Sequence, residues 1–199
     1  ITLPAEEMRF YMLTFALAIV LLMLAGATLL VEHRSLVERA SFDPLTKLPN
    51  RSEFARCAAE VIITAERQGN GFCLLLFDLN GFKQVNDTYG HAAGDEMLKV
   101  VGNRLRKAVR DDDIVARWGG DEFVVVMPGI VDDEMGARRA EQLAEQVSGR
   151  TRLDGVNDAL RVKVSVGVAV WPRHGIELEQ LVEAADQAMY QAKREGVTY

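Results

Sequence analysis

The polar and apolar residues of this chain follow two patterns after residue 41. Four segments have the pattern of helices, with apolar side chains gathered on one face; they are residues 53–67, 94–110, 132–147 and 177–194. Four shorter apolar segments predict strands; they are residues 72–79, 114–118, 123–127 and 162–170. This alternation is typical of a soluble domain that mixes α and β structure.

The order of these segments predicts an α+β fold. After the first helix they run β-α-β-β-α-β, which is the order of ferredoxin-like, palm-type folds, where helices flank a sheet that contains antiparallel strands. The segment 72–79 (FCLLLFDL) is apolar almost without a break, so we expect it in the centre of the sheet. Because this fold carries many functions, the function has to be argued from the site.

Residues 10–31 differ from the rest, because they carry no charge and are apolar on every side. About 22 residues in helical form are long enough to cross a bilayer. A buried core helix is one alternative, but such a helix is shorter or amphipathic. A signal peptide is another, but Glu6 and Glu7 precede the segment where a basic region is expected, and the apolar run continues past residues 25–27. We therefore expect a transmembrane helix.

This expectation divides the chain into four parts: a stub of a larger N-terminal region at 1–9, the transmembrane helix at 10–31, a helical linker at 32–41 and a soluble domain at 42–199. Arg34 and Arg39 follow the span and only Arg9 precedes it, which favours a cytoplasmic soluble domain. The expected location is thus the inner membrane of a bacterium, with the soluble domain in the cytoplasm.

The charge of the chain argues against one class of partner. The net charge is −6 over 199 residues, whereas proteins that bind nucleic-acid polymers usually present a basic face. A nucleic-acid polymer is therefore not expected as a partner. A single nucleotide remains compatible, because a cation and backbone N–H groups can hold phosphates in an acidic protein.

Carboxylates stand at the ends of two predicted strands. Asp78 ends the strand 72–79, and Asp121 and Glu122 follow Gly119 and Gly120 between the strands 114–118 and 123–127. A carboxylate at the end of an apolar strand is costly to bury without a cation. The two acidic elements could share a hard cation such as Mg²⁺, and the glycines would let a ligand approach the backbone. An ordinary turn with solvated acids is the alternative for such a motif in isolation.

Five ordered motifs go beyond that alternative, and over about residues 42–196 the chain resembles the GGDEF-domain diguanylate cyclases. The motifs are residues 43–51 (DPLTKLPNR), 78–95 (DLNGFKQVNDTYGHAAGD), 117–123 (RWGGDEF), 165–169 (SVGVA) and 185–193 (ADQAMYQAK). The resemblance implies the condensation of two GTP molecules into cyclic di-GMP with release of pyrophosphate. It also implies Mg²⁺ or Mn²⁺ as cofactor and a homodimer, because each active site holds one GTP and two sites must face each other.

The resemblance also implies roles for single residues. The metal ligands would be Asp78, Asp121, Glu122 and the backbone carbonyl of Leu79. Glu122 would assist the metal or deprotonate the attacking 3′-hydroxyl, and Asp121, Glu122 and Lys83 form the catalytic set. The substrate-binding residues would be Gly81, Phe82, Asn86, Asp95, Gly119, Gly120 and Lys193. Asn86 and Asp95 would read guanine, Gly81 and Phe82 would hold phosphate through the backbone, and Lys83 and Lys193 would contact phosphate.

A second site is implied at Arg110 and Asp113, which fit the family's R-x-x-D motif for inhibition by the product. An arginine followed by acids in a solvated turn is the alternative. The chain departs from the family after Gly196, where Val197 stands in place of an arginine that contacts phosphate and Arg194 is the candidate replacement. Three other functions remain open: a catalytically weak or inactive domain that serves as a receptor for cyclic di-GMP, a GTP-binding scaffold, and a cyclase that also uses ATP, which Asp95 disfavours.

Overall fold

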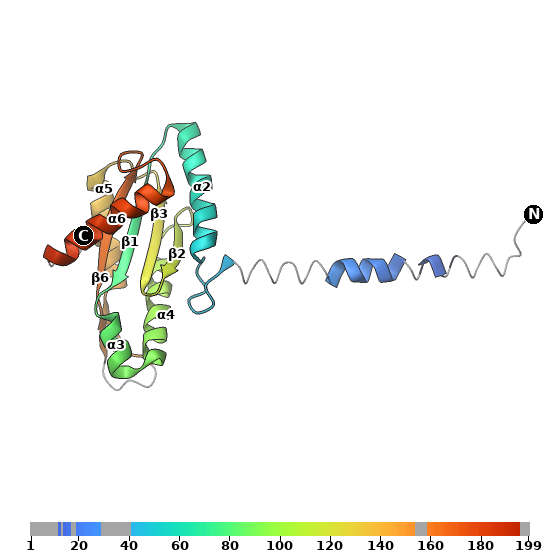
Figure 1. The fold of residues 1–199 in the computed structure, drawn as a ribbon, viewed down its shortest axis with the longest axis horizontal. Helices are drawn as coiled ribbons and strands as arrows, with labels where there is room; N and C mark the ends of the chain where they lie inside the picture. Colours follow the sequence, from blue (N-terminus) through green and yellow to red (C-terminus); the bar gives the residue numbers. More distant parts are fainter. Residues whose placement is uncertain (1–11, 13, 17–18, 29–40, 154–158, 196–199) are drawn as a thin grey trace, which may run out of the picture. The chain divides into compact units, whose positions relative to one another are not determined.

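A computed structural model describes residues 12, 14–16, 19–28, 41–153 and 159–195 (Figure 1). The chain divides into two units, Ile1–Ala40 and Ser41–Tyr199. The described residues of the first unit are helical, and their apolar side chains are exposed, from 42% at Ile19 to 75% at Leu22. In the described part of the chain, no helix is both long and apolar enough to span a membrane. The expected stub at 1–9, most of the linker and part of the span at 10–31 lie outside the described residues.

The second unit is built on a four-stranded sheet in the order β2-β3-β1-β6, with every neighbouring pair antiparallel. Its strands are β1 (Phe72–Leu79), β2 (Ile114–Gly119), β3 (Glu122–Pro128) and β6 (Val164–Trp171). The helices are α2 (Arg51–Gln68), α3 (Phe82–Tyr89), α4 (His91–Ala108), α5 (Asp133–Val147) and α6 (Leu178–Glu195). The predicted α+β fold, an antiparallel sheet flanked by helices, is confirmed.

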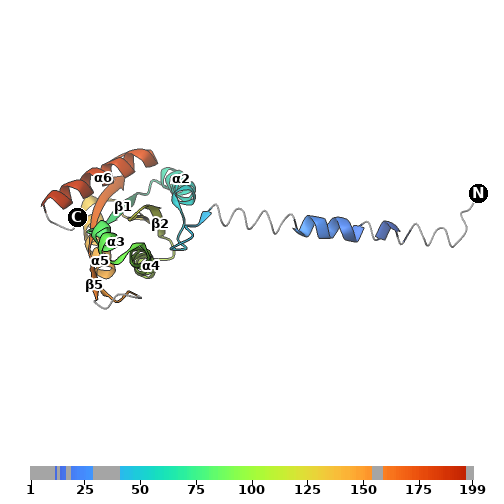
Figure 2. The ribbon, with the colours of Figure 1, turned by 60° about the horizontal axis from the view of Figure 1, so that its bottom comes forward.

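Helices cover both faces of the sheet (Figure 2). The alternation of side chains along β1 separates two hydrophobic cores. Cys73, Leu75 and Phe77 pack with α4 and α5, while Leu74 and Leu76 pack with α2 and α6. Because both faces of β1 are buried, the strand reads as a continuous apolar run, which is the reason that its bounds and its central place could be predicted.

Helix α6 packs directly on β6. A Cβ atom on Gly167 would lie 1.8 Å from the backbone oxygen of Ala185, so the absence of a side chain at residue 167 is what lets the helix approach the strand. Ala185 and Met189 of α6 are buried in this contact. The packing fixes where the last turn of α6 lies relative to the end of β1.

Two local predictions were wrong. No helix was predicted between residues 79 and 94, but Phe82–Tyr89 forms α3, whose half-buried Phe82 and Val85 pack against the core between β1 and α4. The single predicted strand at 162–170 is divided into β5 (Leu160–Val162) and β6, and β5 pairs with the unpredicted β4 (Gly149–Thr151) instead of joining the main sheet.

Candidate active site at the ends of β1 and β3

The predicted metal ligands lie together at one end of the sheet. Asp78 on β1 is directly opposite Glu122 on β3 in the strand register. The backbone N–H of Leu79 donates to the carbonyl oxygen of Asp121 at 3.3 Å, which ties the end of β1 to the β2–β3 turn. The antiparallel pairing of neighbouring strands thus brings acids that are 43 and 44 positions apart in sequence into one cluster.

Burial and, second to it, charge repulsion raise the pKa of two members of this cluster, Asp121 and Glu122. Burial raises the pKa of Asp121, and the negative charge of Asp78 raises it further. Burial also raises the pKa of Glu122, with added repulsion from Asp78, Asp121 and Asp186 of α6. Both carboxylates are only partly exposed. Half-buried acids that repel one another favour a cation in their midst.

Lys193 supplies positive charge to this cluster. Its Nζ atom lies 2.7 Å from Oδ1 of Asp78, and the exposed fractions of the two side chains are 35% and 18%. Lys193 also opposes the rise of the pKa at both Asp121 and Glu122. The last turn of α6 therefore contributes a cation to acids that come from β1 and the β2–β3 turn.

The donor set fits a divalent cation that is shared with a phosphate group. In the part of the chain that the structure describes, no three His, Cys, Asp or Glu side chains gather into a group that could hold a metal by itself. Mg²⁺, however, is usually held by one or two carboxylates while substrate phosphates and waters complete its shell. Asp78, Asp121 and the Leu79 carbonyl match that requirement, because they offer two carboxylates and one neutral oxygen at adjacent strand ends.

Hydrogen bonds from Arg117 hold the β2–β3 turn, which carries Asp121. The Nε and Nη2 atoms of Arg117 donate to the carbonyl oxygen of Gly120 at 3.1 and 2.7 Å, and Nη1 donates to both carboxylate oxygens of Asp43. Gly120 has a φ of +51°, a left-handed conformation that glycine adopts without steric cost. Asp43 and Arg117 were not among the predicted site residues, although both lie in the quoted motifs.

The predicted nucleotide residues lie on the helical hairpin that follows β1. Gly81 caps α3, and Phe82 and Asn86 are half-buried on it. The amide oxygen of Asn86 lies against Gly94 of α4, 2.0 Å from where a Cβ on that glycine would be. Asp95 is the next residue of α4, so the two predicted guanine readers come from facing helices. Asp95 and Lys83 are exposed.

The loop between β1 and α3 is held by β6. The hydroxyl of Ser165 donates to Oδ1 of Asn80 at 3.1 Å, and the N–H of Asn80 donates to the carbonyl oxygen of Lys163 at 2.9 Å. Ser165 is buried and stands opposite Asp78 in the register of β1 and β6. The position of Gly81 therefore depends on β6, which the sequence pattern alone did not indicate.

Arg110 and Asp113 form a separate site. The N–H of Arg110 donates to Oδ2 of Asp113 at 2.9 Å, and the N–H of Asp113 donates to the carbonyl oxygen of Arg110 at 3.1 Å. Both residues line a hollow of about 420 Å³, together with Arg138 and Arg139 of α5. The predicted pair thus forms a turn, and two arginines that were not predicted lie at the same hollow.

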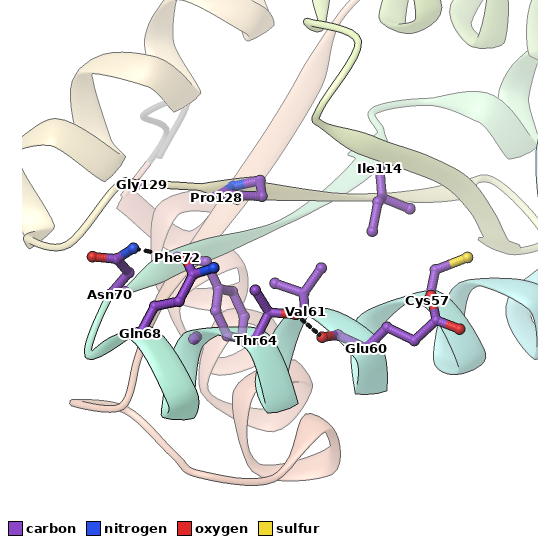
Figure 3. Close-up of a pocket in the computed structure, with 12 residues that line it drawn as sticks. Cys57, Glu60, Val61, Thr64, Gln68, Asn70, Phe72, Ile114, Pro128 and Gly129 are labelled. Atoms are coloured by element: carbon purple, nitrogen blue, oxygen red, sulfur yellow. Dashed lines mark hydrogen bonds between the residues drawn. The ribbon is translucent and has the colours of Figure 1, made fainter.

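A second hollow, of about 320 Å³, lies between α2 and the residues around the start of β1 and the end of β3 (Figure 3). Val61, Phe72, Ile114 and Pro128 give it apolar walls, and Glu60 is among the polar residues that line it. None of the predicted site residues lines it. The acids at the opposite ends of β1 and β3 are therefore not part of this hollow.

Comparison with known proteins places the chain in a family. The family model described as "Diguanylate cyclase, GGDEF domain" matches residues 40–198. The bifunctional diguanylate cyclase/cyclic di-GMP phosphodiesterase MucR of Pseudomonas aeruginosa is 39% identical over 164 residues, which is 82% of this chain and 24% of MucR. The cyclic di-GMP phosphodiesterase NbdA of the same species is 35% identical over 164 residues, 82% of this chain and 21% of NbdA. The chain thus spans only about a quarter or less of these two relatives.

A solved structure shows the same fold. The coiled coil and GGDEF domain of DgcB from Caulobacter crescentus, solved in complex with c-di-GMP, matches with a TM-score of 0.79 at 29% sequence identity. The match covers 91% of this chain and 95% of that one. The family model covers most of the chain, and the acids of its motif meet at one end of the sheet. The chain therefore belongs to the GGDEF-domain diguanylate cyclase family.

Proposed function

We propose that this chain is a diguanylate cyclase that condenses two GTP molecules into cyclic di-GMP and releases pyrophosphate. The observation that supports this most is the cluster of Asp78, Asp121 and Glu122 beside an intact Gly-Gly turn. Relatives of this chain include proteins named as diguanylate cyclases. One relative is named as a phosphodiesterase, so family membership alone does not fix the activity, and the acids of this chain carry the argument.

The site residues would divide the work as follows. Asp78, Asp121 and the Leu79 carbonyl would hold Mg²⁺ or Mn²⁺, which would stabilise the charge that develops on the reacting phosphates. Glu122 would accept the proton of the attacking 3′-hydroxyl, a role that its raised pKa suits, because a base works best when its pKa is close to the working pH.

The remaining residues would bind and orient the substrate. Asn86 and Asp95 would bind the edge of guanine. The carboxylate of Asp95 would accept from the N1–H and N2–H donors of guanine, and the amide of Asn86 can both donate and accept hydrogen bonds. The N–H groups of Gly81 and Phe82 would face the phosphates, where Lys83 and Lys193 would add positive charge. Gly119 and Gly120 would let the substrate lie close to the backbone of the turn.

We propose that the active form is a homodimer. Each 3′-hydroxyl must attack the α-phosphate of the other GTP, so two sites have to face each other, and a single copy holds one site. Bringing the two bound substrates into contact lowers the barrier through proximity. Association of two copies would then control the rate.

Membrane anchoring through residues 10–31 is also part of the proposal, with the catalytic domain in the bacterial cytoplasm, where GTP is available. It rests on the uncharged sequence of that segment and on the exposed apolar side chains of its described residues, such as Phe15 and Leu22. Fractionation of cells that express the chain should place it in the membrane pellet, resistant to high salt and released by detergent. Recovery in the soluble fraction would contradict the anchor.

Product inhibition through Arg110 and Asp113 completes the proposal. The hollow beside them has room for a ligand and is lined by Arg138 and Arg139 as well, so it concentrates positive charge. Arginine side chains bind phosphate groups in bidentate fashion, and cyclic di-GMP carries two. The same hollow supports the second candidate function, a weak or inactive cyclase that serves as a receptor for cyclic di-GMP, because it lies apart from the acids of the β2–β3 turn.

One experiment separates the two functions. The full chain in detergent is incubated with GTP and Mg²⁺, and cyclic di-GMP is followed by chromatography, with the Asp121→Asn variant as control. Product from the wild type that disappears in Asp121→Asn supports the cyclase. Absence of product from both, with binding of cyclic di-GMP that depends on Arg110, supports the receptor.

A further inference from the structure

We infer that Lys193 competes with the divalent cation for Asp78, so that the metal and the nucleotide phosphates bind to this site as a coupled pair. The inference rests on the proposed function of the site and adds a second role for Lys193. The resemblance to the family assigns this lysine to phosphate. In the structure its ammonium lies on a carboxylate that the metal needs.

The contact that carries the inference is short and partly shielded from water. Nζ of Lys193 is 2.7 Å from Oδ1 of Asp78, and only 18% of the Asp78 side chain is exposed. An ammonium ion and a divalent cation cannot occupy the same face of one carboxylate oxygen, because their like charges repel strongly at such distances. A metal that binds to Oδ1 of Asp78 must therefore displace Lys193, and a metal that binds to Oδ2 meets the repulsion of the ammonium on the neighbouring oxygen.

Lys193 also neutralises the acids around it. Asp78 stands opposite Glu122 in the register of β1 and β3, and the N–H of Leu79 donates to the carbonyl oxygen of Asp121, so the ammonium on Asp78 lies within the same cluster of acids. A metal ion that arrives alone would break an ion pair and push a cation away from two further acids. The binding energy of the metal alone is reduced by both effects.

The nucleotide changes this balance because its phosphates offer the ammonium another partner. A lysine side chain carries its charge on a flexible four-carbon stem and behaves as a point charge that can move between anions. Lys193 lies in the last turn of α6, where the stem leaves a helix that is anchored at Gly167. Displacement onto a phosphate would keep the ammonium paired while it frees Asp78.

Such an exchange couples the two ligands in both directions. If the nucleotide draws Lys193 away from Asp78, it raises the affinity for the metal, and the metal must raise the affinity for the nucleotide by the same factor. Free metal ions would then bind weakly to the resting protein, and the site would fill when both ligands are present.

The test measures metal binding without turnover. Mn²⁺ is titrated by isothermal calorimetry into the nucleotide-free full chain in detergent, for the wild type, Lys193→Met and Arg194→Met. Arg194 is a matched control, because it lies in the same turn and loses the same charge, with its guanidinium over the Tyr190 ring. Lys193→Met should bind Mn²⁺ about fivefold more tightly than Arg194→Met, which corresponds to roughly 1 kcal/mol for one ion pair.

A second arm adds the nucleotide and confirms the site. With the non-reactive analogue guanosine 5′-(α,β-methylene)triphosphate present, the advantage of Lys193→Met over the wild type should disappear. The wild type is the reference in this arm because Arg194 is itself a candidate phosphate contact. Adding Asp78→Asn to Lys193→Met should remove the gain in Mn²⁺ affinity, which shows that the gain belongs to this site. Thermal unfolding of each variant verifies that it is folded.

Equal Mn²⁺ affinities of Lys193→Met and Arg194→Met would overturn the inference, and so would an advantage that persists unchanged with the analogue. Neither result depends on catalysis. Failure of the proposed function would be seen separately, as absence of cyclic di-GMP when the wild type receives GTP and Mg²⁺.

Discussion

Asp43 and Arg117 are 74 positions apart in sequence and form an ion pair. A single nitrogen of the arginine, Nη1, lies 3.0 and 3.1 Å from the two carboxylate oxygens. The same guanidinium holds the carbonyl oxygen of Gly120, the residue before Asp121. The pair therefore connects the start of the domain to the turn that carries the acids. Only 15% of each side chain is exposed, so the pair is shielded from solvent.

Replacing Asp43 by Asn should destabilise the domain by roughly 1–3 kcal/mol, the cost of losing hydrogen bonds to charged groups. Urea denaturation monitored by circular dichroism would measure it. Removing the charge should also loosen the turn and lower the rate of cyclic di-GMP formation. Glu53→Gln is the matched control, because the ion pair of Glu53 is with exposed Arg56 of its own helix and does not reach the β2–β3 turn. Equal stability of the two variants would contradict a structural role for the Asp43–Arg117 pair.

The pH dependence of this pair follows from the same contacts. Burial alone would raise the pKa of Asp43, but hydrogen bonds from Thr46 and Arg117 outweigh it and hold the pKa below the ordinary value of 3.8. A carboxyl whose pKa is lowered by folding stabilises the fold above its unfolded pKa and loses that contribution as the pH falls through the folded pKa. The stability gap between wild type and Asp43→Asn should therefore be full at neutral pH and shrink only below about pH 4. A difference in stability between wild type and Asp43→Asn that stays constant down to pH 3 would contradict the view that the charge of Asp43 stabilises the fold.

Asp121 should show the opposite behaviour. Burial and the charge of Asp78 raise its pKa above the ordinary value of 3.8. A carboxyl with a raised pKa contributes stability below its unfolded pKa and loses it as the pH rises through the folded pKa. In the presence of EDTA, Asp121→Asn should therefore be more stable than the wild type at pH 7, and the two should converge as the pH approaches 4. Thermal unfolding at both pH values tests this, and a variant that is less stable at pH 7 would contradict it.

Arg110→Ala should weaken the binding of cyclic di-GMP at least tenfold, because a guanidinium bound to phosphate contributes more than 1.4 kcal/mol in a partly enclosed site. Calorimetric titration of cyclic di-GMP measures the change. Arg161→Ala provides the control, since Arg161 is exposed on β5, outside the residues that line the hollow. The rates of cyclic di-GMP formation measured with and without added cyclic di-GMP should differ less in Arg110→Ala than in Arg161→Ala. Undiminished inhibition would place the inhibitory site elsewhere.

Gly167→Ala should destabilise the domain strongly, although it adds only one methyl group. The new Cβ would lie 1.8 Å from the backbone oxygen of Ala185, so α6 has to move, and overpacking of this kind costs about 1–3 kcal/mol or more. Gly102→Ala is the matched control, because the nearest atoms to its Cβ are side-chain carbons at 3.3 Å and the site lies in a helix, where alanine is favoured. Denaturant midpoints compare the two, and equal midpoints would show that α6 adapts freely.

Local sequence patterns predicted the elements that are set by burial. The strand 72–79 was predicted to the residue, because both its faces are buried. The helix predicted at 132–147 corresponds to α5, whose N-cap is Asp132, with its carboxylate accepting a hydrogen bond from the N–H of Met135. Helix α3 was missed, because it is eight residues long and only two of its apolar side chains reach the core. In a segment this short the polar residues dominate the sequence pattern, and such a pattern is typical of a loop.

The sequence motifs predicted which residues form the candidate site, but not all of the contacts between them. Asp78, Asp121 and Glu122 were identified as a cluster, and the register of β1 and β3 brings them together. The ion pair of Lys193 with Asp78 and the tie from Arg117 to Asp43 were not predicted. These contacts join residues more than 70 positions apart, and their geometry depends on the seating of α6 and on the fold around Asp43, which no local pattern contains.

Strand β1 belongs to both hydrophobic cores, since alternate side chains point to opposite layers. The two layers therefore cannot accumulate substitutions independently of each other. A change that shifts β1 to suit one layer disturbs the packing of the other, and it moves Asp78 at the end of the strand as well. Directed evolution of this domain should therefore accept new side chains on the outer surfaces of its helices long before it accepts them along 72–77, and paired changes on the two sides of the strand should be tolerated better than single ones.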